Sequence, residues 1–573
     1  MGLLQDQILL LESGGLSGHF VFLGLFAAVF ALAHYLLKGK REWRGIVESL
    51  IAITFAIWAI WEFRVQLSAA ARPFVGFLQS DGALIKPQLL LMFFGLGILL
   101  TDFLLEPGQK VFNAVMAMMG VFFAAWALWQ LQGRVAAEGR DEVGFAGTLL
   151  IDHFAIFFGL LFLAATALVI LLSVKYLELE RENHGEIYAL MMFATIGMMF
   201  MVEGIDIIVQ FIGLETMAFS FYILVGFLRR ERRSNEAALK YLLLGAFSSG
   251  ILAYGLSLLY GLSASTNLYD ITNSVIHRES NSPLVLLALV TVAAGLFFKV
   301  AAVPFHQWAP DVYEGAPTVI TAYLSVASKA ASFALLLRLF QLAFWPVRDH
   351  WTALLGVVAV ASMTVGNLAA ITQTNIKRML AYSSISHAGY ILLGLVAAGS
   401  GGPIGNETVG LQAVSFYLLA YAFMNLGAFA VVIILRRQGV IGDELEDLNG
   451  LIHRSPSAAV MLLIFMLSLA GIPPTIGFVG KYFIFLALLQ TGHYYLAIFA
   501  ALYVVPALYY YFRVIVHAFL REGTDPVKIV VSTGQTVALT ACAALVLGAG
   551  LYPEPFIRLA HYSLFLPFGP LGR

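Results

Sequence analysis

Four charged residues lie in the middle of apolar segments that are long enough to cross a membrane: Glu215, Lys299, Lys329 and Lys481. A lysine or glutamate at the centre of a spanning helix costs roughly 2.5–3.5 kcal/mol on insertion scales. Such a residue is kept mainly where an ion or proton pathway needs it; the alternative is a static ion pair that holds helices together. These four residues are therefore the first candidates for function.

Acid–base chemistry suits these residue types. Burial in a low dielectric disfavours the charged form of a lysine, whereas a nearby carboxylate favours it. A movable Glu215 beside Lys299 would therefore switch the proton affinity of that lysine. Histidine has the unperturbed pKa closest to neutral, and His387 lies inside an apolar span, where a proton-path role is expected. Hydroxyl groups for further polar steps belong to Ser328, Ser383, Ser384, Ser386, Tyr382 and Tyr390.

Several other polar residues leave more than one interpretation open. Lys240 either joins the pathway or extends toward water at the membrane surface, because it lies about two turns from a basic loop. His306 is as compatible with a structural hydrogen bond as with a relay. Glu203 and Asp206 fall near the outer ends of their predicted helices and are expected to be solvated. Asp152 is expected to begin a helix at the membrane interface.

Proline interrupts two of the charged spans. Lys299 precedes Pro304, and Lys481 follows Pro473-Pro474. Proline removes a backbone donor and breaks a helix, and broken helices in transporters expose polar backbone near the middle of the membrane. Both lysines are therefore expected to lie beside a helix break.

Composition assigns the chain to the polytopic membrane proteins. Of its 573 residues 60% are hydrophobic and only 12% are charged, and its mean hydropathy is +0.87. A soluble domain averages roughly 45–50% apolar residues, so that a bilayer must cover the excess. The net charge of -1 argues against a basic surface for nucleic acid. No cleavable signal peptide is recognisable, so the N-terminal segment is expected to be retained.

The chain is not expected to hold a cofactor or metal of its own. Its one cysteine, Cys542, lies in an apolar run. Iron–sulfur clusters need several thiolates, zinc usually needs three or four ligands and a disulfide needs two cysteines. No phosphate-binding glycine-rich motif is present. Any nucleotide chemistry must therefore take place on a partner.

Sixteen segments approach the roughly 20 apolar residues that a spanning helix needs. They are residues 18–37, 46–66, 87–106, 111–132, 149–173, 187–203, 204–228, 238–260, 283–303, 317–341, 351–371, 379–398, 411–435, 457–489, 494–519 and 530–552. The segment 457–489 is too long for one straight crossing and should break at its prolines. The two Pro-interrupted spans lie five spans apart, which predicts two five-helix repeats, 187–341 and 351–519. An odd number of helices makes such repeats inverted.

Loop charge predicts the orientation. If the first loop is cytoplasmic, alternate loops carry eighteen lysines and arginines on the cytoplasmic side, against eight on the other. Positive charge is retained inside, so both termini are expected on the outer side. The arginine run 229–233 is expected to act as a topological signal, and the acidic segment 443–454 as a solvated cytoplasmic connector or docking surface.

Four stretches carry a family resemblance: FIGLETMAFSFYILVGF, FKVAAVPFHQWAPDVYEGAPTVITAYLSVASKAASFALLLRLF, TQTNIKRMLAYSSISHAGY and MLSLAGIPPTIGFVGKYF. They resemble subunit N of the bacterial proton-pumping NADH:quinone oxidoreductase, respiratory complex I, whose mitochondrial counterpart is NADH dehydrogenase subunit two. The resemblance runs from about residue 87 to 555. The D-V-Y-x-G-A-P and A-S-K-x-A forms look like subunit N rather than its relatives.

The resemblance implies roles for individual residues. Glu215 would be the fifth-helix carboxylate, Lys299 the seventh-helix lysine, Lys329 the eighth-helix connecting lysine and Lys481 the twelfth-helix terminal lysine. Lys240 would match the sixth-helix lysine. The implied fold is all-α: a 14-helix antiporter-like core over residues 81–555, preceded by an extension, 1–80, with two extra helices, and followed by a short tail, 556–573.

The implied function is proton translocation in the membrane arm of complex I, in a bacterial cytoplasmic (inner) membrane. NADH, FMN, iron–sulfur clusters and quinone would then bind partner subunits. The expected neighbours are the antiporter-like subunit M, the small subunits K and J, and lipid, with no nucleic acid. The alternatives are an Mrp-type cation/proton antiporter subunit, a membrane subunit of a related hydrogenase or ferredoxin-driven complex, and a structural scaffold without a working channel.

Overall fold

The computed structural model describes residues 80–138, 141–182, 184–276, 282–400, 407–436, 442–523, 529 and 531–563. The chain divides into two units, Met1–Ile85 and Lys86–Arg573. The described part of the first unit contains α5 (Asp81–Leu84). The two expected spans 18–37 and 46–66 lie outside the described residues.

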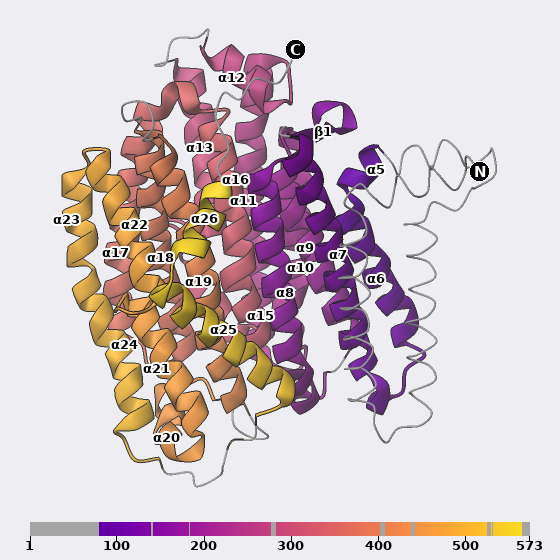
Figure 1. The fold of residues 1–573 in the computed structure, drawn as a ribbon, viewed down its shortest axis with the longest axis vertical. Coiled ribbons are helices and arrows are strands. Elements are labelled where there is room, and N and C mark those ends of the chain that lie inside the picture. The colour runs from indigo at the N-terminus through magenta and orange to yellow at the C-terminus, as the bar shows by residue number, and fades with distance from the viewer. Residues whose placement is uncertain are drawn as a thin grey trace. The chain divides into compact units, whose positions relative to one another are not determined.

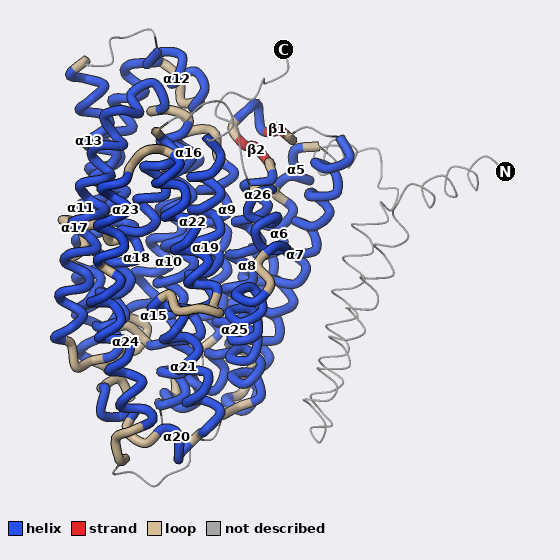
Figure 2. Tube along the Cα trace, turned by 60° about the vertical axis from the view of Figure 1, so that its left-hand side comes forward, coloured by secondary structure: helices blue, strands red, loops and turns tan. Residues whose placement is uncertain are grey.

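The second unit is a bundle of helices that lie side by side (Figures 1 and 2). Among the described residues, twelve helical stretches are long and apolar enough to cross a membrane. They are α7 (Val111–Glu138), α8 (His153–Glu180), α9 (Gly185–Glu203), α10 (Ile207–Val225), α11 (Arg232–Ser263), α13 (Pro283–Val300), α15 (Thr318–Tyr323) with α16 (Lys329–Gln341), η5 (Trp345–Val347) with α17 (Arg348–Thr372), α18 (Ile376–Gly399), α19 (Glu407–Leu435), α23 (Tyr494–Leu502) with α24 (Val504–Phe519), and α25 (Thr533–Leu551).

Shorter helices complete the described part of this unit. They are α6 (Lys86–Asp102), η2 (Pro107–Gln109), η3 (Phe145–Gly147), α12 (Leu268–Ile276), α14 (Trp308–Gly315), η6 (Leu445–Leu448), α20 (Leu451–Arg454), α21 (Pro456–Ala470), α22 (Ile476–Gln490) and α26 (Glu554–Tyr562). The all-α polytopic fold class is confirmed.

A small sheet replaces the expected beginning of the span 149–173. β1 (Glu142–Gly144) pairs antiparallel with β2 (Leu149–Ile151), with Val143 opposite Leu150. The helix α8 begins only at His153, because the Asp152 side chain accepts a hydrogen bond from the Ala155 amide and caps its first turn. The apolar residues of β2 are buried all the same, which is why hydropathy alone merged them with the helix.

Both predicted helix breaks are present. The helix α13 ends at Val300, where Ala301 adopts φ +58°, and α14 starts only at Trp308. The helix α21 ends at Ala470 before Gly471 at φ +86°, and α22 starts at Ile476. In each predicted five-helix unit the break falls in the fourth helix. The inverted duplication itself stays a prediction.

The helices at the centre of the bundle carry the candidate residues. The stretch Thr318–Gln341 and the helix from Val409 to Leu435 are fully buried, whereas α11 and the α23–α24 stretch expose most of their length. A five-residue π-helical segment, Leu324–Ser328, directly precedes Lys329. Such segments often mark functional positions because they interrupt regular backbone pairing. The sequence pattern did not predict it.

Candidate functional site

Glu215 and Lys299 face each other, as the sequence predicted. Glu215 lies in the middle of α10 and Lys299 in the last turn of α13, and the Lys299 Nζ is 4.0 Å from the Glu215 Oε1. Lys299 donates a hydrogen bond to the Ser249 Oγ of α11 at 3.2 Å. Among the described residues, the buried Glu215 Oε1 has no hydrogen-bond partner. The ion pair is therefore loose, and a small movement of either helix separates it.

Lys329 lies in the core and contacts only neutral oxygens. Its side chain, on α16, is buried and its Nζ donates to the Ser384 carbonyl at 2.9 Å and to the Ser384 Oγ. The Tyr421 ring lies 5.9 Å from this ammonium. No ion pair to Lys329 occurs within the described ranges. The charged form is thus held by weaker dipoles than in Lys299.

Lys481 binds backbone that a helix break leaves open. Its Nζ donates to the carbonyl of Ala470 at 2.8 Å and to that of Leu469 at 3.2 Å. These carbonyls belong to the last turn of α21, where no further helical residue pairs with them and the helix dipole favours a cation. The Tyr390 ring lies 5.2 Å from the ammonium. The expected proximity of this lysine to the Pro473-Pro474 break is therefore explained.

One face of α18 connects Lys329 with Lys481. Ser383, Ser384, His387 and Tyr390 repeat at helical spacing along it. The His387 Nδ1 lies 2.7 Å from the Tyr417 hydroxyl and its Nε2 lies 3.1 Å from the Tyr511 hydroxyl. The Tyr511 hydroxyl in turn lies 2.5 Å from the Ser383 Oγ. His387 is thus in the position that the sequence predicted for a polar step.

The remaining predicted steps are not drawn into this network. His306 lies in the α13–α14 break, and its buried Nδ1 has no hydrogen-bond partner among the described residues. No hydrogen bond that the structure describes joins Ser328, Ser386 or Tyr382 to a lysine. Lys240 is 42% exposed and pairs with Glu236 and Asp311, each at 2.9 Å. It contributes to a different charged cluster.

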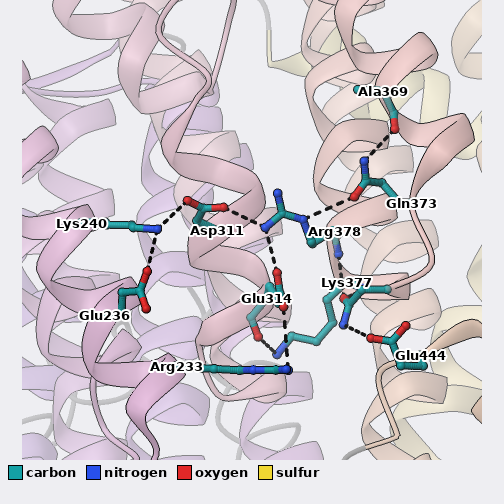
Figure 3. Close-up of polar contacts among 11 residues, drawn as sticks. Arg233, Glu236, Lys240, Asp311, Glu314, Ala369, Gln373, Lys377, Arg378 and Glu444 are labelled. Carbon is teal, nitrogen blue, oxygen red and sulfur yellow. Dashed lines mark hydrogen bonds and ion pairs between the residues drawn. The ribbon is translucent and has the colours of Figure 1, made fainter.

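This cluster, called here the α14 clamp, consists of Lys240, Asp311, Glu314, Lys377 and Arg378. Arg378 lies between Asp311 and Glu314, at 2.8 Å from each (Figure 3). The buried Lys377 Nζ donates to the carbonyls of Glu314 and Ala316, at 2.7 and 2.8 Å. A pocket of about 280 Å³ opens between these side chains. The clamp was not predicted from the sequence because its residues lie at helix ends, where charge is ordinary.

Electrostatics keep the clamp charged. Burial raises the pKa of Asp311, but the hydrogen bonds from Lys240 and Arg378 outweigh this effect and hold the pKa below its ordinary value. The clamp joins α11, α14 and α18. It therefore fixes the short helix α14 from both sides.

The expectation of solvated carboxylates at the outer helix ends is wrong. Glu203 is 1% exposed and accepts a hydrogen bond from the Gln88 Nε2 at 2.5 Å. Asp206 is 7% exposed and caps α10 by accepting from the Ile208 amide at 2.8 Å. Packing of neighbouring segments over the helix ends removes the water that sequence position alone suggests.

A buried ion pair at this end was also missed. Asp152 begins α8, as predicted, but it is buried and binds both terminal nitrogens of the Arg338 guanidinium at 2.8 Å. The Arg338 Nε also donates to the Val202 carbonyl at 2.7 Å. An arginine in the apolar run of α16 needs such a partner, and that need was the available signal.

One group of side chains has the spacing of a metal site. Among the described residues, possible ligand atoms of Asp102, His184 and Glu186 lie within 4.8 Å of one another. The Asp102 carboxylate already pairs with Lys110 at 2.8 Å and accepts from Asn113 at 2.5 Å. This group is therefore accounted for as a hydrogen-bonded loop contact.

Comparisons with known proteins agree with this geometry. A family model described as the membrane part of NADH:quinone oxidoreductase and Mrp antiporters matches residues 205–505. The chain is 54% identical to NADH-quinone oxidoreductase subunit N 1 of Koribacter versatilis, over 85% of this chain and 96% of that relative.

Solved structures give the same picture. A chain of respiratory complex I from Thermus thermophilus with bound aureothin is 31% identical, with a TM-score of 0.69, over 83% of this chain and 99% of that one. A chain of the Mrp complex from Dietzia is 21% identical, with a TM-score of 0.71, over 82% of this chain and 96% of that one, and shares the fold. The more similar proteins are those of the oxidoreductase.

Proposed function

Because this chain belongs to the subunit N family of the NADH-quinone oxidoreductases, we propose that Glu215, Lys299, Lys329 and Lys481 are the residues through which it moves protons. The chain is a proton-translocating subunit of the membrane arm of complex I. The observation that supports the residue assignment is the burial of three lysines on separate helices, each at most 6% exposed, with polar side chains between them.

The first step uses the loose Glu215–Lys299 pair. While Glu215 is close, its negative charge favours the protonated Lys299. When a conformational change elsewhere in the complex moves the carboxylate away, the ammonium loses its one anionic neighbour among the described residues. Lys299 then gives up a proton and becomes a neutral amine, and Lys329 gains that proton through intervening water. No bond other than N–H and O–H bonds is made or broken.

The second step passes along α18. Lys329 releases its proton to the hydroxyl and imidazole groups of Ser384 and His387, and Lys481 receives it on the far side. Lys481 finally releases the proton toward the outer side of the membrane. His387 supports this route because both its ring nitrogens face tyrosine hydroxyls. His306 and Lys240 have a supporting role at most, since neither contacts the three buried lysines.

The orientation and the partners belong to the same proposal. The clamp end of the bundle, which includes the arginine run 229–233, faces the cytoplasm, and both termini face outward. Electron transfer takes place on partner subunits that bind NADH, FMN, iron–sulfur clusters and quinone. The neighbours within the membrane are subunits M, K and J together with lipid, which cover the exposed apolar faces of α11 and α24.

Substitution of the first pair tests this assignment. In the assembled complex, Lys299→Ala and Glu215→Ala are expected to lower proton pumping and coupled NADH:quinone turnover at least about tenfold, since a carrier or its modulator is lost. Lys175→Ala is the matched control, because Lys175 is an exposed lysine paired with Glu178. Pumping is measured by dye quenching in membrane vesicles, with assembly verified by native gel. Unchanged stoichiometry in an assembled variant would sink the assignment of that residue.

A further inference from the structure

The short helix α14 touches both inner lysine sites. Its first residue, Trp308, donates its indole N–H to the Phe298 carbonyl at 2.9 Å, and Phe298 directly precedes Lys299. Further along α14, the Tyr313 hydroxyl lies 3.4 Å from the Ser384 Oγ, the oxygen that also accepts from Lys329. The clamp holds the same helix through Asp311 and Glu314. A displacement of α13 at Lys299 therefore reaches Lys329 through one rigid element.

The hydroxyl chemistry around Lys329 requires a second partner for Ser384. A serine hydroxyl that accepts a hydrogen bond from an ammonium must direct its own proton to another acceptor. Tyr313 provides that acceptor, and it is 1% exposed. The Tyr421 ring also lies near Lys329, but its hydroxyl has no hydrogen-bond partner among the described residues. Typical O–H···O distances are about 2.7–2.8 Å, so the Tyr313–Ser384 contact has room to tighten.

We propose that Tyr313 is a positioning residue for proton transfer at Lys329, acting through Ser384. With Lys329 protonated, Ser384 accepts from the ammonium and donates to Tyr313. With Lys329 neutral, the two hydroxyls reverse: Tyr313 donates to Ser384, and Ser384 donates to the amine. The pair thus holds Ser384 against Lys329 in both states, and the position of α14 decides how tightly it does so. The protons of the two hydroxyls only turn, and no covalent bond is exchanged.

The variant Tyr313→Phe removes the hydroxyl and keeps the ring, which packs on Trp308 and Phe429. We expect coupled turnover and pumping to fall about tenfold, the order of one hydrogen bond in a charged network. The alkaline limb of the turnover–pH profile should move to lower pH, because Ser384 then supports the ammonium less well. Tyr323→Phe is the matched control: its buried hydroxyl contacts Thr166 and Thr195, at 3.0 and 2.7 Å, and no lysine.

A double substitution separates a positioning role from a packing role. If Tyr313 acts through Ser384, Tyr313→Phe adds no further loss to Ser384→Ala, whereas Ser384→Thr, which keeps the hydroxyl, retains most activity. Additive losses, an unmoved pH profile, or a shift caused by Tyr421→Phe instead would overturn the proposal. So would failure of Tyr313→Phe, but not of Tyr323→Phe, to assemble, because Tyr313 would then be needed for folding.

This inference rests on the proposed function, and one further variant keeps the two apart. Lys329→Ala should abolish pumping whether or not Tyr313 is involved. If Lys329→Ala pumps normally in an assembled complex, the proposed function of Lys329 fails. If Lys329→Ala is inactive and Tyr313→Phe matches the wild type, only the role of Tyr313 fails.

Discussion

The three buried lysines differ in what stabilises their charge. Lys299 has a carboxylate at 4.0 Å, Lys329 has a hydroxyl and a carbonyl of one serine, and Lys481 has two carbonyls at a helix end. A carboxylate that can move changes the proton affinity of its partner strongly, whereas fixed dipoles change it little. The only adjustable environment in this series is therefore that of Lys299, at the start of the proposed route.

The charge of Asp311 gives a residue-scale prediction. Its pKa is held below the ordinary value, so its contribution to stability is fully present above about pH 4 and is lost only as the pH falls through the lowered pKa. Asp311→Asn should therefore speed thermal inactivation of the assembled complex equally at all pH values between about 6 and 9. The cost should be about 1 kcal/mol or less, because the pair is partly exposed.

The matched control for Asp311 is Glu236→Gln, which removes the other carboxylate paired with Lys240. Glu236 is on the exposed side of α11, and its loss should leave the inactivation rate unchanged. Equal effects of the two variants, or an effect of Asp311→Asn that changes with pH in this range, would contradict the clamp as the cause.

At the residue scale the sequence predicted charges better than hydroxyls. Lys299, Lys329 and Lys481 are identifiable because a charge in an apolar run has few explanations. Ser384 was one of several possible polar steps, and nothing in its spacing distinguished it from Ser386. Tyr313 was not predicted, because a tyrosine near a proline-rich segment is usually a packing residue. Only the fold places its hydroxyl beside Ser384.

At the element scale, the break between α21 and α22 positions Lys481. Gly477, in the first turn of α22, donates its amide to the Ser468 Oγ at 3.2 Å. A Cβ at this position would lie 1.9 Å from the Ser468 carbonyl oxygen. Gly477→Ala must therefore push α22 away from α21, and Lys481 away from the carbonyls that it binds. We expect a several-fold loss of coupled turnover, measured on assembled complex, with overpacking costing roughly 1–3 kcal/mol.

Gly548→Ala, in α25, is the control for this variant. A Cβ at Gly548 meets nothing within 4 Å, and alanine is the better helix former by roughly 0.5–1 kcal/mol. Turnover should be unchanged and stability equal or slightly higher. If Gly477→Ala behaved like Gly548→Ala, the close approach of the two half-helices would not matter for Lys481.

Helix breaks were predictable and helix irregularities were not. Proline marks a break chemically, so that the interruptions after Lys299 and before Lys481 follow from the sequence. The π-helical segment before Lys329 and the hairpin of β1 and β2 have no comparable marker, because both consist of residues typical of spanning helices. The helix α14 was not among the predicted elements, since eight residues are too few for a hydrophobic pattern to be recognised.

At the scale of the whole molecule, burial separates the route from the membrane surface. The fully buried helices carry Lys329 and its neighbours, whereas the exposed helices lie at the rim of the bundle (Figure 1). Both clusters of buried charge near helix ends, Arg338 with Asp152 and the α14 clamp, involve the first five-helix unit. These clusters fix the ends of the helices between which Lys299 and Lys329 lie.

The orientation of the bundle gives a prediction for the entire molecule. The helix α11 has 32 residues and is about 48 Å long, so that its two ends lie on opposite sides of a hydrocarbon core of about 30 Å. The native Cys542 is buried, so single cysteines at exposed positions near these ends can be labelled selectively. Asn235→Cys, beside the arginine run, and Asn273→Cys, in α12, provide the pair.

If positive charge is retained inside, a membrane-impermeant maleimide should label Asn273→Cys in spheroplasts and Asn235→Cys in inverted vesicles, and neither preparation should label the parent chain. The opposite pattern would turn the bundle over, and Lys481 would then release protons toward the cytoplasm. Since a respiratory complex must release protons on the outer side, that result would reverse the proposed order of the three lysines while leaving their contacts unchanged.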